Sequence, residues 1–153
     1  MARGKYQLGN MAFGAGAIAI ASASGDAGGP RVIQLLAIGA NRSRNGKPPV
    51  VTVDDRAHAD RIVQATIAWH SSADIVVDYD HQSMFGARAG VGGRAPAAGW
   101  MKRVYADDQG VFAEVDWTDA AAASLGAREY RFLSPAFTHD KSGRPIAIIN
   151  AAL

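Results

Sequence analysis

The sequence contains no cysteine. This absence excludes disulfide bonds, thiolate metal sites and a cysteine nucleophile together, and it is compatible with a reducing compartment. Aromatic residues make up only 8% of the chain, so the core must rest mainly on Ile, Val and Leu. An excess of one sign of charge is also missing, because 16 basic residues face 14 acidic ones. That balance predicts no polyanion-binding patch, and we expect no nucleic-acid partner.

Long hydrophobic runs are missing as well. Residues 11–23 are the most apolar N-terminal stretch, but they are too few and too rich in Gly and Ala to span a bilayer. Two interpretations of this stretch stay open. It is either the core of a signal peptide, with Arg3 and Lys5 as its basic flank, or a first strand behind a flexible leader. We interpret the chain as cytosolic, without a membrane partner, and residues 1–30 as a flexible leader with a possible first strand.

The remaining residues, 31–153, suit one compact domain. A helix is predicted over residues 55–69 because its start is acidic, and a second over residues 120–125, capped by Thr118 and Asp119 and ended by Gly126. Seven apolar segments have the length of strands. They are residues 31–38, 50–53, 73–81, 99–106, 111–117, 131–138 and 145–152.

Tight turns are predicted between several of these strands. Residues 107–110 and 139–144 each contain a glycine between two apolar runs, which predicts hairpins. Hairpins favour antiparallel pairing. We therefore predict an α+β fold, a mostly antiparallel, curled or closed β-barrel of about seven strands with two or more helices packed outside it. Residues 84–96 hold four glycines and predict a mobile loop.

The four histidines lie in different settings. His58 falls on a polar helix face, where we expect it to be solvated. His70 falls at a helix end, where a histidine stabilises the C-terminal dipole, and His139 falls in a surface turn. Only His81 lies where an apolar strand opens into the loop at residues 84–96, a typical place for a functional side chain on a rigid scaffold.

Asp78, Asp80 and His81 together suggest a metal site. Strand alternation weakens that interpretation, because it places Asp78 and Asp80 on one face and Tyr79 and His81 on the other. The chain also offers no cysteine and no second histidine at ligand spacing. A metal-dependent hydrolase is the weaker hypothesis, and we expect no metal and no cofactor.

Ser134 lies between Leu133 and Pro135 in an apolar run. From the residues alone it is either a strand serine with a locally satisfied hydroxyl or a nucleophile. Pro135 favours extended geometry at Ser134, and because it cannot donate to a ladder it predicts an edge strand or a bulge. It also excludes an oxyanion hole built from the amide after Ser134, so the donors must come from another segment.

Four segments, in their order along the chain, resemble the Mu-like prophage I protein family, which is related to the prohead proteases and to herpesvirus assemblin. The resemblance extends over about residues 31–153. The DYDHQ and YRFLSPAF sequences are specific when they occur together in this order. The segments are residues 77–82 (VDYDHQ), 95–100 (APAAGW), 108–118 (DQGVFAEVDWT) and 130–137 (YRFLSPAF).

The resemblance implies a serine endopeptidase that processes scaffold and major capsid precursor proteins inside the assembling prohead, in the cytoplasm of the bacterial host. It implies His81 as general base and Ser134 as nucleophile. In the related prohead proteases a third polar residue comes from the strand after the nucleophile hairpin. The resemblance therefore implies Asn150, the only polar side chain in residues 146–153. An amide orients a histidine but does not neutralise an imidazolium as a carboxylate does.

The family pattern also implies a longer precursor that processes itself and carries its scaffold portion C-terminal to the protease domain. We expect self-association to accompany activation. The alternative function is a non-catalytic capsid-assembly or scaffold-binding protein of the same fold.

Overall fold

The computed structural model describes residues 11–13, 16–17, 28–43, 48–85 and 94–153. Its helices are α1 (Arg56–His70), α2 (Gln82–Phe85) and α3 (Asp119–Gly126). Its strands are β1 (Met11–Phe13), β2 (Gly16–Ala17), β3 (Val32–Ala37), β4 (Gly39–Arg42), β5 (Val50–Val53), β6 (Ile75–Asp78), β7 (Gly99–Asp107), β8 (Gly110–Trp117), β9 (Phe132–His139) and β10 (Pro145–Ala152).

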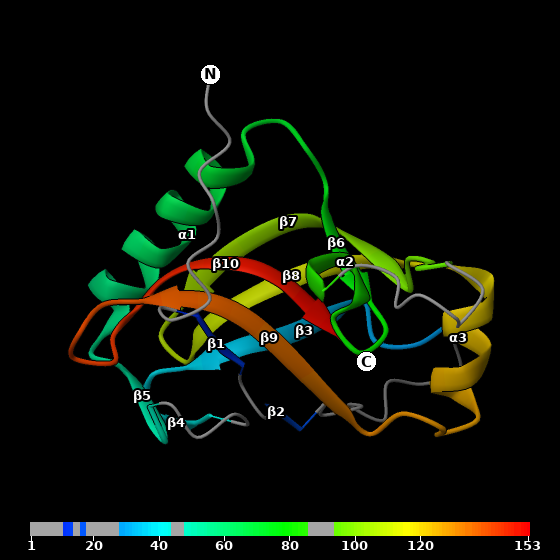
Figure 1. Cartoon of the computed structure of the whole chain (residues 1–153), viewed down its shortest axis with the longest axis horizontal. Coiled ribbons are helices and arrows are strands. Elements are labelled where there is room, and N and C mark those ends of the chain that lie inside the picture. The colour runs from blue at the N-terminus through cyan, green and yellow to red at the C-terminus, as the bar shows by residue number, and fades with distance from the viewer. Residues whose placement is uncertain (1–10, 14–15, 18–27, 44–47, 86–93) are drawn as a thin grey trace.

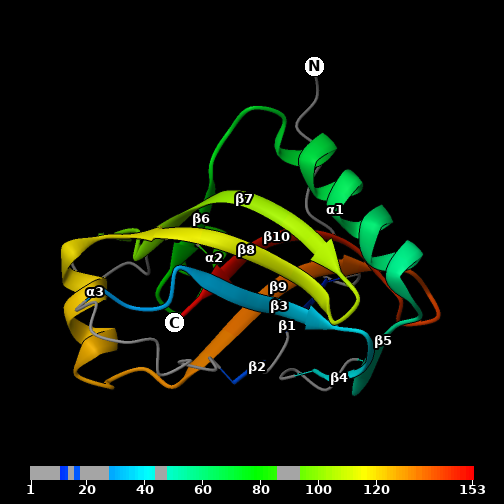
Figure 2. The same cartoon turned by 180° about the vertical axis from the view of Figure 1, so that it is seen from behind.

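One curled sheet contains most of these strands. Its order is β1–β9–β10–β6–β7–β8–β3, with β2 also paired to β9. Of the strand pairs in the described ranges, only β6 and β10 run parallel. β3 approaches β9, so the sheet is nearly closed (Figure 1, Figure 2), while β4 and β5 form a separate two-stranded sheet. The predicted α+β architecture, a curled and mostly antiparallel barrel, is confirmed.

All seven predicted strands are present and β4 adds to them, while β1 and β2 lie in the stretch interpreted as a possible first strand. Both predicted helices are present with side-chain N-caps. Asp55 accepts the His58 N–H at 2.7 Å, and Thr118 accepts the Ala121 N–H at 3.3 Å. The short helix α2 was not predicted. It takes up the first residues of the predicted mobile loop, of which residues 86–93 lie outside the described residues.

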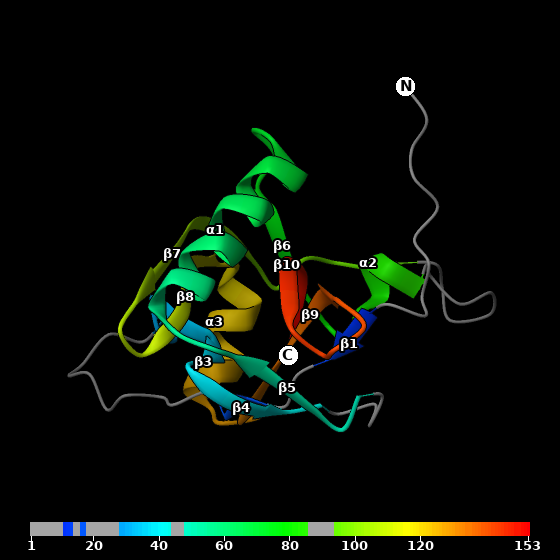
Figure 3. The ribbon, with the colours of Figure 1, turned by 90° about the vertical axis from the view of Figure 1, so that its left-hand side faces the viewer.

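The helices lie around the sheet. α1 crosses β10 and β7 at one end and α3 lies at the other (Figure 1), and a view from the α1 side shows β7, β8 and β3 facing β10, β9 and β1 (Figure 3). None of the helices in the described ranges is long and apolar enough to cross a membrane. The core is mainly aliphatic, as the composition predicts. Its largest fully buried apolar side chains include Phe137, Leu36, Ile62, Leu125, Leu133 and Ile148.

A carboxylate closes the β9–β10 hairpin. Asp140 Oδ1 accepts hydrogen bonds from the Ser142 hydroxyl at 2.7 Å, the Ser142 N–H at 2.8 Å and the Arg144 N–H at 3.0 Å. The bond from the Ser142 hydroxyl is the main reason that the pKa of Asp140 lies below its ordinary value. This closed turn is where the pairing of the two strands begins.

β9 carries Pro135 between partner strands rather than at an edge. On one side it pairs with β10, in a ladder that shifts register between Ile148 and Asn150. On the other side it pairs with β1 at residues 136–138 and with β2 at residues 132–133. Pro135 therefore lies between these two pairings, where no N–H is needed from it. The predicted edge strand or bulge is not found in β9: the extra residue of the register shift is Ile149, which belongs to β10.

α1 supplies partners for the backbone of β10. β6 borders β10 only at Ala151 and Ala152, so earlier groups of β10 need other partners. The Ile148 N–H donates to Thr66 Oγ1 at 2.9 Å, and the Ile148 carbonyl accepts from His70 Nε2 at 3.0 Å. Thr66 and His70 therefore make the backbone hydrogen bonds that a neighbouring strand would otherwise make next to the bulge.

The prediction that His58 is solvated is wrong. His58 is 6% exposed. Its Nδ1 accepts the Asp54 N–H at 3.1 Å, which leaves Nε2 protonated to donate to the Pro145 carbonyl at 2.9 Å. The helix face of His58 looks polar in sequence, but the start of β10 covers it.

The prediction of a strand through residue 81 is also wrong. β6 ends at Asp78, and Asp80 and His81 adopt left-handed backbone conformations with φ of 55° and 56°. Such angles are uncommon for residues other than glycine. The chain therefore leaves the sheet before His81, and strand alternation does not determine where the imidazole points.

Thr66→Val should lower the free energy of unfolding by about 1–3 kcal/mol, because it leaves the buried Ile148 N–H without an acceptor at nearly unchanged volume. Thr66→Ser keeps the acceptor and should lose less. Urea unfolding monitored by circular dichroism measures both. Equal midpoints for the wild type and Thr66→Val would contradict this role of the hydroxyl.

Asp80→Gly should keep or slightly raise the stability, since glycine adopts the left-handed conformation without strain. Asp80→Val should lower the free energy of unfolding by about 1–3 kcal/mol, because a β-branched residue tolerates that conformation poorly. The Asp80 side chain is exposed, so neither change removes buried contacts. Thermal and urea unfolding provide the comparison, and the opposite ranking of the two variants would show that the turn is not strained.

Candidate active site

The pairing of β9 with β10 places four side chains on one face. Ser134 lies opposite Ala152, and Ala136 lies opposite Asn150. Directly opposed residues and residues two apart share a face, so Ser134 and Asn150 occupy diagonal corners of this group. The other two corners carry alanine, and all four residues are buried. Because a diagonal pair is typically about 7–8 Å apart, a flat side chain fits between the two polar corners.

His81 spans this diagonal. Its Nε2 lies 2.9 Å from Ser134 Oγ, and its Nδ1 lies 2.9 Å from Asn150 Oδ1. In the sequence, His81 is separated from Ser134 by 53 positions and from Asn150 by 69. The structure therefore brings together all three residues predicted for the site, with His81 in contact with both Ser134 and Asn150.

The hydrogen bonds of Asn150 define the protonation of the imidazole. Asn150 Oδ1 faces His81, and its Nδ2 donates to Ser83 Oγ at 2.9 Å and to Asp78 Oδ2 at 3.4 Å. An acceptor at Oδ1 requires a proton on His81 Nδ1. The lone pair of Nε2 then points to the Ser134 hydroxyl, so the arrangement can remove the proton of Ser134.

Asp78 and Ser83 extend this network, and the sequence did not predict their part in it. Asp78 is 1% exposed, and its Oδ2 accepts the Ser83 N–H at 2.8 Å as well as the Asn150 amide. The prediction from strand alternation placed Asp78 and His81 on opposite faces, because it assumed a regular strand as far as residue 81. The sequence does contain a signal for Asp78: it is an acidic residue at the end of an apolar strand. A carboxylate buried there needs hydrogen-bond donors from other residues.

The other predicted candidates lie apart from the network. His58 and His70 contact the backbone of β10, and His139 Nδ1 lies 2.7 Å from the Asp140 carbonyl oxygen. Tyr79 packs against Tyr130, with 5.7 Å between the ring centroids, and burial raises the pKa of its hydroxyl above the ordinary value.

Metal binding finds no support in the geometry of the described residues. No group of three or more His, Asp or Glu side chains among them is placed to hold a metal ion. Asp78 and His81 are buried, whereas Asp80 is exposed. The three residues considered as metal ligands therefore do not converge.

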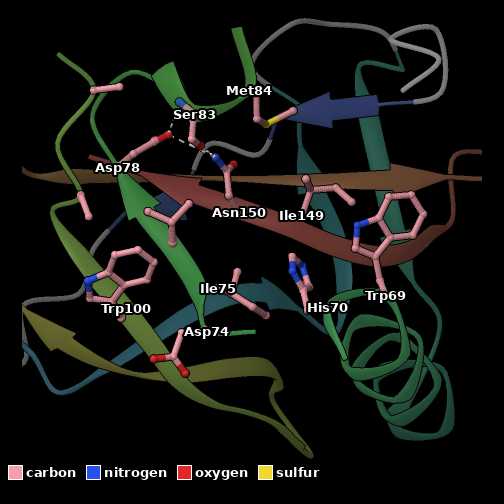
Figure 4. A pocket seen from close by; sticks show the side chains of 13 residues that line it. Trp69, His70, Asp74, Ile75, Asp78, Ser83, Met84, Trp100, Ile149 and Asn150 are labelled. Atoms are coloured by element: carbon pink, nitrogen blue, oxygen red, sulfur yellow. Dashed lines mark hydrogen bonds between the residues drawn. The ribbon is translucent and has the colours of Figure 1, made fainter. Parts of the chain in front are cut away.

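A pocket of about 660 Å³ lies beside the side chains of Asp78, Ser83 and Asn150 (Figure 4). Asp78, Ser83 and Asn150 line it, whereas Ser134 and His81 do not. Trp69 and Trp100 lie on its walls, and both remain about half exposed, at 51% and 41%. The pocket thus reaches the Asn150 end of the hydrogen-bonded chain rather than the Ser134 end.

Comparison with known proteins agrees with the order of segments in the sequence. The family model described as Mu-like prophage I protein, N-terminal domain, matches residues 33–153. The Mu-like prophage FluMu I protein of Haemophilus influenzae (strain ATCC 51907 / DSM 11121 / KW20 / Rd) is 34% identical over 134 residues, covering 78% of this chain and 36% of that protein. The chain thus spans about a third of its relative's length, and no solved structure gives a significant match. The chain belongs to the Mu-like prophage I protein family, and it corresponds to the N-terminal domain of that family.

Proposed function

We propose that this chain is a serine endopeptidase that processes scaffold and major capsid precursor proteins during phage head maturation. The observation that supports this proposal is the chain of hydrogen bonds from Ser134 through His81 to Asn150, with both contacts to the imidazole at 2.9 Å. A serine hydroxyl is a poor nucleophile until a positioned base accepts its proton. Membership of a phage family supports the place of action, within the assembling prohead in the cytoplasm of the bacterial host.

In the proposed reaction, His81 Nε2 takes the hydroxyl proton as Ser134 Oγ attacks the peptide carbonyl carbon. The tetrahedral intermediate collapses when His81 returns that proton to the leaving amine, which breaks the C–N bond and leaves an ester on Ser134. Water, deprotonated by the same nitrogen, then hydrolyses the ester. The amide of Pro135 cannot stabilise the oxyanion because proline has no N–H.

Asn150 holds the imidazole in the required orientation and tautomer throughout these steps. It accepts from Nδ1 but brings no full charge to compensate the imidazolium that forms. A Ser–His–Asn arrangement is therefore expected to depend on geometry more than a Ser–His–Asp arrangement does.

The burial of the site is also compatible with the alternative function, a non-catalytic scaffold-binding protein. Ser134 is 5% exposed and His81 is 7% exposed. The two side chains therefore present little surface to a substrate. A latent protease shows this arrangement, and so does a non-catalytic scaffold-binding protein of the same fold. Self-association during assembly is the activating event that we propose for the latent form.

Ser134→Ala and His81→Gln should each reduce cleavage of the scaffold and capsid precursors of the same phage by at least about 10³-fold. A fluorophosphonate probe should label the wild type at Ser134, and neither variant should react with it. Cleavage is measured by gel electrophoresis and mass spectrometry, and labelling by intact mass.

Ser72→Ala is the matched control, because it changes an exposed serine in the turn after α1, away from the β9–β10 hairpin. It should cleave and react with the probe like the wild type. Cleavage that survives in Ser134→Ala, or that EDTA abolishes in the wild type, would overturn the proposal. Binding of the scaffold without cleavage or labelling would favour the non-catalytic alternative.

A further inference from the structure

The amide of Asn150 can adopt two orientations of almost the same shape, which differ by exchange of Oδ1 and Nδ2. The two orientations select opposite tautomers of His81. With Oδ1 toward the imidazole, Nδ1 must carry the proton and Nε2 can accept from Ser134. With Nδ2 toward the imidazole, the proton moves to Nε2, and the imidazole can no longer act as a base toward Ser134.

Ser83 does not distinguish between these orientations. Its hydroxyl lies 2.9 Å from Asn150 Nδ2, and a hydroxyl can either donate or accept. If the amide turned over, Ser83 could rotate its proton and donate to Oδ1 instead. The contact therefore satisfies either orientation at little cost.

Asp78 does distinguish between them. Its Oδ2 already accepts the Ser83 N–H at 2.8 Å, and so it faces Asn150 as an acceptor at 3.4 Å. Turning the amide over would set two acceptor oxygens against each other in a site where Asp78 is 1% exposed. Oδ1 of Asp78 has no hydrogen-bond partner within the described part of the chain, so its orienting contacts run through Oδ2.

We infer that Asp78 is a positioning residue: its buried carboxyl group fixes the orientation of the Asn150 amide and thereby holds the proton of His81 on Nδ1. The Ser83 N–H fixes Asp78 in turn, and this bond comes from the backbone. The effect on catalysis rests on the proposed protease function. The effect on the tautomer does not.

The tautomer can be measured without any substrate. Long-range ¹H–¹⁵N spectra of protein labelled with ¹⁵N-histidine distinguish a protonated from an unprotonated ring nitrogen, and the His81→Gln variant assigns the signals of His81. In the wild type, Nδ1 should carry the proton at a pH where the ring is neutral. A proton on Nε2 in the wild type would overturn the inference directly.

Three variants separate orientation from other effects. Asp78→Ala should give a mixture of tautomers or the opposite one. Asp78→Asn should restore the wild-type tautomer, because the Ser83 N–H will hold the oxygen of the new amide in the position of Oδ2. Ser83→Ala is the matched control, since it removes the other partner of Nδ2, and it should leave the tautomer unchanged.

Circular dichroism and thermal unfolding check that each variant is folded. If Asp78→Ala does not fold, Asp78→Leu is used, since its side chain has nearly the same shape and no acceptor. A folded Asp78→Ala or Asp78→Leu with the wild-type tautomer would overturn the inference, and so would a Ser83→Ala variant that loses it.

Kinetics give the second measurement. In Asp78→Ala, kcat should fall by about 10²- to 10⁴-fold while KM stays close to that of the wild type, because the wrong tautomer removes the base and not the binding surface. Asp78→Asn should recover most of the loss. If the wild type cleaves nothing but shows the expected tautomers, the proposed function fails and the role of Asp78 stands.

Discussion

The register of β9 against β10 is the constraint on which the site depends. It sets Ser134 and Asn150 at diagonal corners of one face, with alanine at the other two, and the imidazole of His81 bridges the diagonal. A slip by one residue would move the side chains of one strand to the opposite face. The geometry of Ser134, His81 and Asn150 and the pairing of β9 with β10 are therefore one property of the fold.

That register is stabilised from several directions. At the turn, Asp140 binds three donors of the hairpin. Along the strand, Thr66 and His70 of α1 bind the backbone of Ile148, next to the bulge that precedes Asn150. None of the hydrogen bonds from Ser134 through His81 to Asn150 involves α1, but α1 stabilises the strand that carries Asn150. A change on this helix would act on the site through β10.

Sequence reasoning predicted the features that depend on local chemistry. Glycine and acidic residues located both hairpins, and Asp55 and Thr118 located the helix starts, because turns and caps follow from a few neighbouring residues. It failed where contacts between segments that are distant in the sequence determine burial and backbone direction. His58 looks polar in its helix and is buried by β10. Asp78 was set apart because a regular strand was assumed, and only the backbone angles at Asp80 and His81 show that the chain turns away.

The order of the elements along the chain has a consequence for synthesis on the ribosome. The N-terminal elements emerge first, and the imidazole of His81 is made well before its two partners. Ser134 and Asn150 both belong to the hairpin that follows every other described element. A nascent chain therefore carries His81 before it carries Ser134 or Asn150, and the three side chains can meet only after β10 has been made. The topology itself delays the formation of this hydrogen-bonded network.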